Sequence, residues 1–276
     1  MLNSFYVEEH IKNALREDIG YGDITTESIV GEDKIFRAKL VSRAEGIICG
    51  LKVFETVFRI LSRDIEINLL FNEGETIKKG DVLATIKGSG RSILLGERVA
   101  LNYIQRMSGI ATETRKYQDA IGDLPCKIVD TRKNTPGFRA FEKYSVKCGG
   151  GALHRFNLSD CAMIKDNHIG FAGSVTEAVN RVKANISHAH KIEIECDTLN
   201  QVREAIALGV DIIMLDNMPI ETMKEAVEII NHQAIVEASG NVTLDNIRAI
   251  AECGVDIISS SAIVAKAPAL DLGIDI

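Results

Sequence analysis

Tryptophan is absent from this chain of 276 residues, and proline occurs only four times. So few prolines exclude a proline-rich linker, and the 22 glycines follow no collagen-like repeat. No run of about 18 uncharged apolar residues occurs, which excludes a membrane-spanning helix. The residues that are present, 46% hydrophobic and 26% charged, are typical of a soluble folded protein.

The N-terminal segment also lacks the features of a secretory signal. It reads MLNSFYVEEHIKNALREDIG, with acidic residues where a signal peptide has a basic region followed by an apolar run. The six cysteines are widely spaced and form no C-x-x-C motif, so neither a zinc site nor a disulfide framework is indicated. We therefore expect buried, reduced thiols in a cytoplasmic protein that has no membrane partner.

Positive charge is scarce overall, because the net charge of the chain is −7. An acidic chain is a poor ligand for nucleic acid. Between Lys127 and His168, however, eight Lys and Arg residues face only four Asp and Glu residues. This basic segment in an acidic chain predicts a small anionic ligand. A solvated surface patch is the alternative that charge alone leaves open.

Apolar, β-rich runs recur through the second half of the chain: CKIVDTR, CAMIKD, KIEIECD, DIIMLD, AIVEAS and VDIISS. Helical stretches such as TLNQVREAIALG and PIETMKEAVEIIN follow them. Six such units in series predict parallel strands joined by right-handed crossovers. Because no G-x-G-x-x-G follows a strand, an α/β barrel, complete or incomplete, is favoured over an open doubly wound sheet.

The first half of the chain has a different pattern. Residues 34–96 are mostly strand-like, with a possible helix at KVFETVFRILS. The long helical pattern GERVALNYIQRMSGIATETRKYQDAI then leads into the second domain. We place the first domain at residues 1–110 and the second at residues 111–266, with residues 267–276 packing back on the first.

Charged and small polar residues stand where the strands of the expected barrel end, which is where such barrels place their active sites. Cations there suit carboxylates, acidic side chains suit Mg²⁺ or sugar hydroxyls, and small turns suit a phosphate. The pattern predicts a phosphorylated sugar on one side and an acidic compound on the other. The alternative is that these residues pair among themselves on a solvated rim. The strand-end residues are Arg132, Lys133, Lys165, Glu195, Asp216, Ser239, Gly240, Ser260 and Ser261.

The segment DTRKNTPGFRAFEKYSVKCGGGALHRFNLSDCAMIKDNHI (130–169) resembles the quinolinate phosphoribosyltransferase family. The resemblance extends over essentially the whole chain. It includes GYGDITTE, GERVALNYIQRMSGIAT, EIECDTLNQ, MLDNM, EASGNV and GVDIISSSA.

The resemblance implies a fold and a reaction. The fold is an N-terminal α/β sandwich domain followed by an incomplete, open α/β barrel. Quinolinate and phosphoribosyl pyrophosphate react in the presence of Mg²⁺ to give nicotinate mononucleotide, pyrophosphate and CO₂, a step of NAD biosynthesis. The family forms homodimers or larger homo-oligomers in which neighbouring subunits share the active site.

The resemblance further implies roles for individual residues. Those expected to hold the quinolinate carboxylates are Arg98, Arg132, His154, Arg155 and Lys165, with Arg98 supplied by the neighbouring subunit. Those expected to act on the phosphoribosyl donor as catalytic residues are Lys133, Glu195 and Asp216, the last two also toward the metal.

Two turns and one threonine complete the expected site. The turns Ser239–Gly240–Asn241 and Ser260–Ser261–Ala262 are expected to hold the 5′-phosphate, and Thr131 joins the substrate-binding residues. The family pattern favours glycine at two positions where Asn241 and Ser261 stand here.

Two other functions compete with this interpretation. A sister phosphoribosyltransferase would accept another acidic aromatic compound, such as nicotinate. A carrier or binding module would use the 34–96 sheet, in which GETIKKGDVLATIKG is similar to lipoyl or biotinyl carriers but lacks their Lys-centred hairpin.

Overall fold

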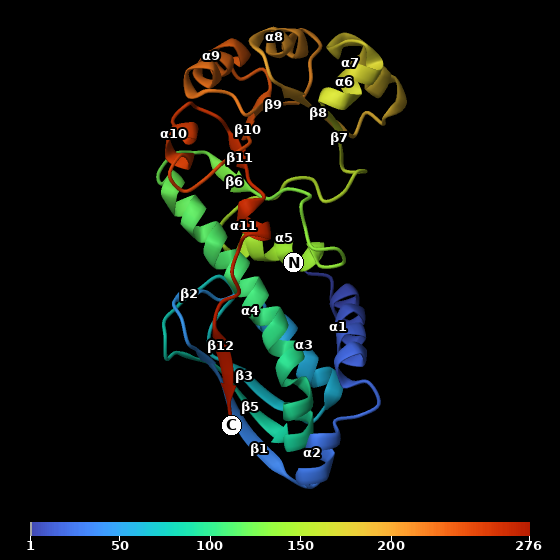
Figure 1. Cartoon of the computed structure of the whole chain (residues 1–276), viewed down its shortest axis with the longest axis vertical. Coiled ribbons are helices and arrows are strands. Elements are labelled where there is room, and N and C mark those ends of the chain that lie inside the picture. Colours follow the sequence, from blue (N-terminus) through green and yellow to red (C-terminus); the bar gives the residue numbers. More distant parts are fainter. Residues whose placement is uncertain (1) are drawn as a thin grey trace. The chain divides into compact units, whose positions relative to one another are not determined.

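A computed structural model describes residues 2–276, and its contacts divide the chain into two compact units (Figure 1). The first unit contains the described residues up to Arg115, together with Thr135–Gly150 and Ala267–Ile276. The second unit contains Lys116–Asn134 and Gly151–Lys266. The predicted division after residue 110 stays a prediction.

The first unit is built on a four-stranded antiparallel sheet with the strand order β12-β1-β5-β3. β12 comes from the far end of the chain and pairs with β1 through Leu40↔Ile274 and its neighbours. β2 and β4 form a separate, two-stranded antiparallel sheet. The elements are α1 (Ser4–Ile19), α2 (Ile24–Ile29), β1 (Ile35–Ser42), β2 (Gly46–Ile47), α3 (Leu51–Leu61), β3 (Glu66–Leu69), β4 (Thr76–Ile77), β5 (Val82–Ser89), α4 (Gly90–Ile121), α5 (Arg139–Cys148) and β12 (Leu272–Asp275).

The core of the first unit follows from the periodicity of its elements. α3 places Phe54 and Phe58 on one face, and both side chains are fully buried. Leu40 and Ile86 come from the buried face of the sheet, and Ile104 comes from α4. Apolar residues three and four positions apart form one stripe of a helix, so α3 buries its apolar side against this cluster.

The second unit is built on a six-stranded parallel sheet with the order β6-β11-β10-β9-β8-β7. β6 and β7 stand at opposite ends of this order, so the sheet is open and the barrel is incomplete (Figure 1). This result confirms the predicted fold class. The elements are β6 (Lys127–Val129), β7 (Cys161–Ile164), α6 (Asp166–Ala172), α7 (Val175–Asn185), β8 (Lys191–Cys196), α8 (Leu199–Ala207), β9 (Ile212–Asp216), α9 (Ile220–Ile230), β10 (Ile235–Ser239), α10 (Ile247–Ala251), β11 (Ile257–Ser259) and α11 (Ala262–Ala265).

Alternation along the parallel strands decides which residues face the middle of the open barrel. On β8, Ile192 and Ile194 share one face, and Glu193 and Glu195 share the other. The register sets Glu195 beside Met214, which in turn lies beside Glu237. The inner face of these strands therefore carries carboxylates, whereas the outer face is apolar and is covered by α7, α8 and α9 (Figure 1).

The long helix begins earlier than the sequence pattern indicates. The pattern predicts strand-like structure up to residue 96, but α4 begins at Gly90, directly after β5 ends at Ser89. A Cβ at Gly90 would lie 3.0 Å from the ring of Phe36, so any other residue would have to displace this ring. None of the helices within residues 2–276 combines the length and apolar composition that a transmembrane span requires.

Candidate active site

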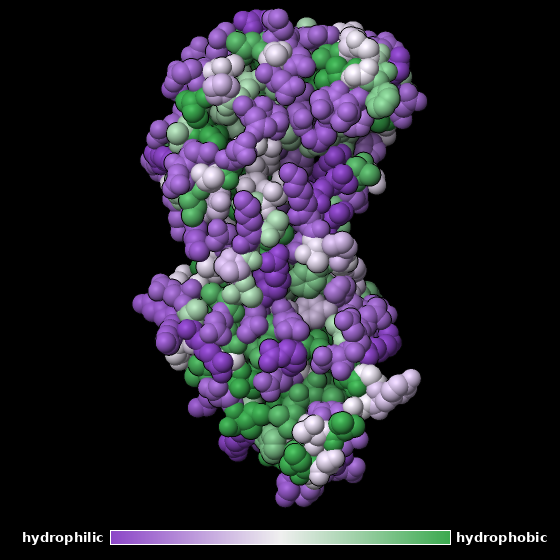
Figure 2. Space-filling view, viewed as in Figure 1, coloured by the Kyte–Doolittle hydropathy of each residue, from purple (hydrophilic) through white to green (hydrophobic). Residues whose placement is uncertain are grey.

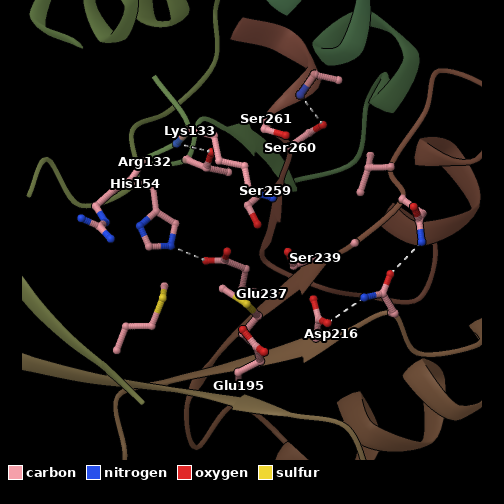
Figure 3. A pocket seen from close by; sticks show the side chains of 18 of the residues that line it. Arg132, Lys133, His154, Glu195, Asp216, Glu237, Ser239, Ser259, Ser260 and Ser261 are labelled. Carbon is pink, nitrogen blue, oxygen red and sulfur yellow. Dashed lines mark hydrogen bonds and ion pairs between the residues drawn. The ribbon is translucent and has the colours of Figure 1, made fainter. Parts of the chain in front are cut away.

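A cavity of about 660 Å³ lies at the C-terminal ends of the parallel strands of the second unit (Figure 3). Residues of all six strands, or of the turns that follow them, line it. Every predicted site residue except Arg98 is among these lining residues. Arg98 is exposed on α4, in the first unit. The roles predicted for these residues stay predictions.

Two cations at the cavity have side chains that no protein group holds. Arg132 and Lys133 follow β6 and are exposed, and within residues 2–276 their side chains form no hydrogen bond or ion pair. In Figure 3 they lie on the same side of the cavity as His154, whereas Asp216 and Ser239 lie on the opposite side. A charged side chain that needs no internal partner remains available for an anionic ligand.

Arg155 is held more firmly than the two exposed cations. Its Nη1 donates to the carbonyl oxygen of Cys161 at 2.7 Å, and its Nη2 lies 3.4 Å from the sulfur of Met163. Its Nε is buried and has no hydrogen-bond partner within residues 2–276. The guanidinium is therefore fixed to β7 and retains an unused buried donor at Nε.

Lys165 and Glu195 form an ion pair across the ends of β7 and β8. The Glu195 side chain is 13% exposed and that of Lys165 is 44% exposed, so the carboxylate is the more buried partner. The sequence assigns these residues to opposite halves of the site. Their ion pair therefore links the two halves of the site to each other.

Asn217 links Asp216 to the turn that follows β10. Its Nδ2 donates to Oδ2 of Asp216 at 2.6 Å, and its Oδ1 accepts a hydrogen bond from Nδ2 of Asn241 at 2.9 Å. Gly240 has φ +96°, and a Cβ there would lie 2.1 Å from Oδ1 of Asn217. Asn241 has φ +48°, a left-handed conformation that asparagine tolerates better than most residues. Asparagine at 241 thus fits the position where the family pattern favours glycine.

Two buried carboxyl groups contact the same nitrogen of the His154 ring. Nε2 of His154 is 3.3 Å from Oε2 of Glu237 and 3.5 Å from Oε1 of Glu193 (Figure 3). Both glutamates are at most 1% exposed. Asp130 accepts the backbone N–H of His154 at 3.0 Å and so holds the main chain of this residue.

These carboxylates change the proton affinity of the cluster. Burial alone lowers the pKa of His154, but Glu193 and Glu237 outweigh it and raise that pKa to about 10. Burial raises the pKa of Glu193 itself. The N–H of Arg155 donates to Nδ1 of His154 at 2.7 Å, which opposes a second proton on the ring. Two buried carboxylates act on the ring more strongly than one amide dipole, so the pKa of His154 is raised overall.

The family is established by comparison with known proteins. The model for the C-terminal domain of quinolinate phosphoribosyl transferase matches residues 110–275, and the model for the N-terminal domain matches residues 23–108. The chain belongs to the quinolinate phosphoribosyltransferase family. This confirms the predicted family and, with it, the prediction of a transferase enzyme.

Individual relatives agree with this membership of the quinolinate phosphoribosyltransferase family. The chain is 46% identical to a probable carboxylating nicotinate-nucleotide pyrophosphorylase of Synechocystis sp., over 98% of this chain and 92% of that one. The structure of NadC from Streptococcus pyogenes has a TM-score of 0.98 at 39% identity and covers 100% and 98% of the two chains. Nicotinate-nucleotide pyrophosphorylase of Ehrlichia chaffeensis has a TM-score of 0.94 at 40% identity, with 100% and 99% covered.

The strand-end argument missed three functional candidates in this quinolinate phosphoribosyltransferase chain. Glu193, Glu237 and Asn217 were not singled out, although the first two surround His154 and the third joins Asp216 to a turn. The signal for the glutamates was available in KIEIEC and AIVEAS, where an acid interrupts an apolar strand. A buried acid needs a partner or a ligand, so each interruption marks a site.

The two carboxylates predicted to serve Mg²⁺ fit a partly open metal site. Glu195 and Asp216 stand at the ends of adjacent strands, and each uses one oxygen in a contact with Lys165 or Asn217. Within residues 2–276, no hydrogen bond reaches the second oxygen of either group. Two carboxylate oxygens are too few to enclose Mg²⁺, but they suit an ion that is also bound by phosphate oxygens and water.

Proposed function

We propose that this protein transfers the phosphoribosyl group of phosphoribosyl pyrophosphate to quinolinate and releases CO₂. The products are nicotinate mononucleotide and pyrophosphate, and the reaction serves NAD biosynthesis. The observation that carries this proposal is one cavity, in a quinolinate phosphoribosyltransferase chain, that combines unpaired cations, paired carboxylates and small polar turns.

We assign the quinolinate carboxylates to the cationic side of the cavity. Arg132 has an unpaired guanidinium, Arg155 has an unused buried Nε, and His154 has a raised pKa that favours its cationic form. Lys165 can exchange its contact with Glu195 for one with the substrate. Guanidinium groups bind carboxylates with two parallel hydrogen bonds, which fixes the plane of the pyridine ring as well as its charge.

We assign the phosphoribosyl donor to the other side. Lys133 would contact the pyrophosphate, and Glu195 and Asp216 would face the ribose. The turns Ser239–Gly240–Asn241 and Ser260–Ser261–Ala262 would hold the 5′-phosphate through backbone N–H groups. The N–H of Ala262 donates to the Ser260 hydroxyl at 3.2 Å, a contact that the phosphate would replace.

The reaction needs positioned substrates rather than a side-chain nucleophile. As the bond between ribose C1′ and the pyrophosphate oxygen breaks, positive charge develops on the ribose, and the carboxylates of Glu195 and Asp216 stabilise it. The lone pair of the pyridine nitrogen then forms the bond to C1′. The alkylated ring is cationic, so the C2 carboxylate leaves as CO₂, and the electron pair left at C2 takes a proton from water.

We also propose that Glu195 and Asp216 would hold Mg²⁺. When bound, the ion neutralises charge on the departing pyrophosphate. Removal of Mg²⁺ by a chelator should abolish turnover without changing the circular dichroism spectrum, and added Mg²⁺ should restore it. Full turnover by the chelated enzyme would contradict a metal requirement.

We propose that the enzyme acts as a homodimer or larger homo-oligomer in which Arg98 enters the neighbour's site. The first unit exposes apolar side chains that a second copy would cover, among them Phe5, Tyr21, Ile24 and Ile29. Figure 2 shows apolar surface gathered toward the α2 end of this unit. We place the enzyme in the cytoplasm, a reducing compartment that suits six cysteines without a disulfide.

The substrate is tested by supplying alternatives. We expect release of labelled CO₂ from quinolinate only when phosphoribosyl pyrophosphate and Mg²⁺ are present. Nicotinate in place of quinolinate should give little nucleotide. Efficient turnover of nicotinate without use of quinolinate would assign the chain to a sister activity, and a covalently modified lysine in residues 34–96, seen by mass spectrometry, would favour a carrier.

The two halves of the site are tested by variants and calorimetry. Arg132→Ala should lower kcat/KM for quinolinate by about 30-fold or more, because loss of one partner of a buried charge pair costs about 2–5 kcal/mol. Asp216→Ala should instead weaken binding of phosphoribosyl pyrophosphate with Mg²⁺ and leave quinolinate binding intact. The opposite pattern would exchange the two assignments.

Sharing of the active site is tested with mixed oligomers. Arg98→Ala and Lys165→Ala should each be nearly inactive alone. When the two variants are unfolded and refolded together, some sites receive both intact residues, so activity should rise well above that of either parent. Mixed oligomers that form, as mass spectrometry would show, but recover no activity would exclude Arg98 from the neighbour's site.

A further inference from the structure

A second cluster of reactive side chains lies wholly in the first unit, apart from the cavity described above. It consists of Cys49, Glu73 and Cys148, whose sulfur and carboxylate oxygen atoms all lie within 4.8 Å of one another. Cys49 lies between β2 and α3, Glu73 lies between β3 and β4, and Cys148 is the last residue of α5. Segments far apart in the sequence thus bring two thiols together beside one acid.

Cys49 is buried and rigidly placed. Its side chain is inaccessible to solvent. Its N–H donates to the hydroxyl of Ser108, and its carbonyl oxygen accepts from the same hydroxyl, both at 3.0 Å. Its sulfur lies 3.6 Å from the hydroxyl oxygen of Ser145. Burial raises the pKa of this thiol well above its ordinary value, so Cys49 stays protonated and its single S–H can donate to one acceptor at a time.

Cys148 has the opposite character. It is partly exposed, its sulfur lies within 4.8 Å of the Cys49 sulfur, and the Cys49 thiol and the Tyr144 hydroxyl are the nearby groups that can donate to it. These donors lower the pKa of Cys148. Burial, the charge of Glu73 and the C-terminal end of α5 all disfavour a thiolate, but the donors near the sulfur outweigh them.

Glu73 has a structural role that leaves the two sulfurs to each other. Its Oε2 accepts the N–H of Gly50 at 2.7 Å, and its Oε1 accepts the N–H of Lys52 at 3.3 Å. The carboxylate therefore caps the start of α3, because these N–H groups have no partner within the helix. Even if the carboxylate joined the two sulfurs, the cluster would offer a metal ion three ligands, one fewer than a structural zinc site uses.

We propose that Cys148 and Cys49 form an oxidisable thiol pair, in which a peroxide oxidises Cys148 and Cys49 then closes a reversible disulfide. The exposed thiol meets the oxidant, and the buried thiol resolves the product. Neither residue lines the cavity of the second unit, so the pair is separate from the proposed transferase chemistry.

Each step balances in atoms and electrons. The Cys148 thiolate attacks one oxygen of hydrogen peroxide, the O–O bond breaks, and a sulfenic acid and hydroxide form. The sulfur of Cys49 then attacks the sulfenic sulfur, the S–O bond breaks, and the Cys49 proton leaves with the oxygen as water. Two electrons have passed from the two thiols to one peroxide. A small dithiol reductant reverses the product by thiol–disulfide exchange.

The chain after Cys148 can accommodate the short movement that closure needs. The sulfurs must approach to about 2.05 Å, so the last turn of α5 must shift. Gly149, Gly150 and Gly151 follow directly, and Gly150 already has φ +93°. Glycine permits backbone changes that other residues resist, which concentrates the movement in this segment.

The test uses the full-length protein treated with a small excess of hydrogen peroxide in the absence of metal. Intact mass spectrometry should show the loss of two hydrogens, and peptide mapping should show Cys49 joined to Cys148. Dithiothreitol should restore the original mass. Cys49→Ser should instead accumulate a sulfenic acid on Cys148 that dimedone traps. If Cys49→Ser does not fold, Cys148→Ser provides the same decision, because it should form no disulfide and leave Cys49 unoxidised.

Cys253→Ser is the matched control, because Cys253 is also buried but has no cysteine partner in the cluster. It should form the disulfide as the parent protein does. A disulfide that joins any other pair, or peroxide treatment that leaves both Cys49 and Cys148 free to alkylate, would overturn the proposal. Zinc that copurifies in a 1:1 ratio and leaves when Cys148 is replaced would overturn it as well, since the sulfurs would then serve a metal.

Discussion

Glu142 holds the start of the segment that follows Arg132 and Lys133 in the chain. Its replacement tests how much these contacts contribute to the free energy of unfolding. Its fully buried carboxylate accepts the N–H of Thr135 at 3.0 Å and the Thr135 hydroxyl at 2.8 Å. It also pairs with Nη2 of Arg106 at 3.4 Å. Replacement by alanine leaves all three donors without this acceptor.

The expected loss follows from these contacts. Removal of one partner of a buried ion pair costs about 3–5 kcal/mol, and partial exposure of Arg106 and Thr135 favours the lower limit, about 3 kcal/mol. Glu142→Gln keeps one carbonyl acceptor and loses the charge, so it should cost about 1–2 kcal/mol. At about 2–4 °C per kcal/mol, the alanine variant should melt about 6–12 °C lower than the parent.

Thermal unfolding followed by circular dichroism measures this effect, and Glu177→Gln is the control. Glu177 forms an exposed pair with Arg181 on α7, so its loss should change the free energy of unfolding by less than about 0.5 kcal/mol. If Glu142→Ala melted with the control, the three contacts would contribute nothing measurable, and the assignment of Glu142 as the anchor of this segment would be wrong.

Three further predictions concern single positions. Nitrogen NMR should show the imidazole of His154 still in its cationic form at pH 8, because its pKa is raised to about 10. The stability that this raised pKa contributes is full below about pH 6.5 and is lost as the pH rises through about 10. Titration of His154 at or below pH 6.5 would contradict this prediction. Gly240→Ala should raise KM for phosphoribosyl pyrophosphate, because its Cβ would displace the Asn217 side chain; an unchanged KM would remove this turn from the donor site. Gly149→Ala should destabilise the fold by about 1–3 kcal/mol in denaturant unfolding, because its Cβ would lie 2.4 Å from the carbonyl oxygen of Ala111. A free energy of unfolding equal to that of the parent would mean that the backbone shifts to accommodate the added methyl group.

The sequence predicted the second unit well because buried parallel strands leave a strong signal. All six apolar runs form strands of one sheet, and the residues at their ends meet at one cavity. Each run is apolar on both faces except where an acid or a polar residue turns inward, so its length and position can be recognised without tertiary information. The pairing of His154 with Glu193 and Glu237 was harder to recognise, because it joins residues that lie far apart in the sequence.

The excursion of residues 135–150 into the first unit could not be predicted from local pattern. α5 follows β6 and has the periodicity of any crossover helix, so the sequence favours a place beside the barrel. Phe141 instead belongs to the core of the first unit, where its ring lies 4.8 Å from those of His10 and Phe138. Such a choice depends in part on His10, which lies more than a hundred residues away in the sequence, and no periodicity records this contact.

The place of β12 in the first sheet has a consequence for synthesis on the ribosome. β1 pairs on one side with β5, which is made soon after it, but its other edge waits for β12 until all of the second unit has emerged. During translation this edge presents unpaired N–H and C=O groups to other nascent chains. The chain therefore has a stage at which mispairing competes with folding, and it ends only when Leu272–Asp275 leave the exit tunnel.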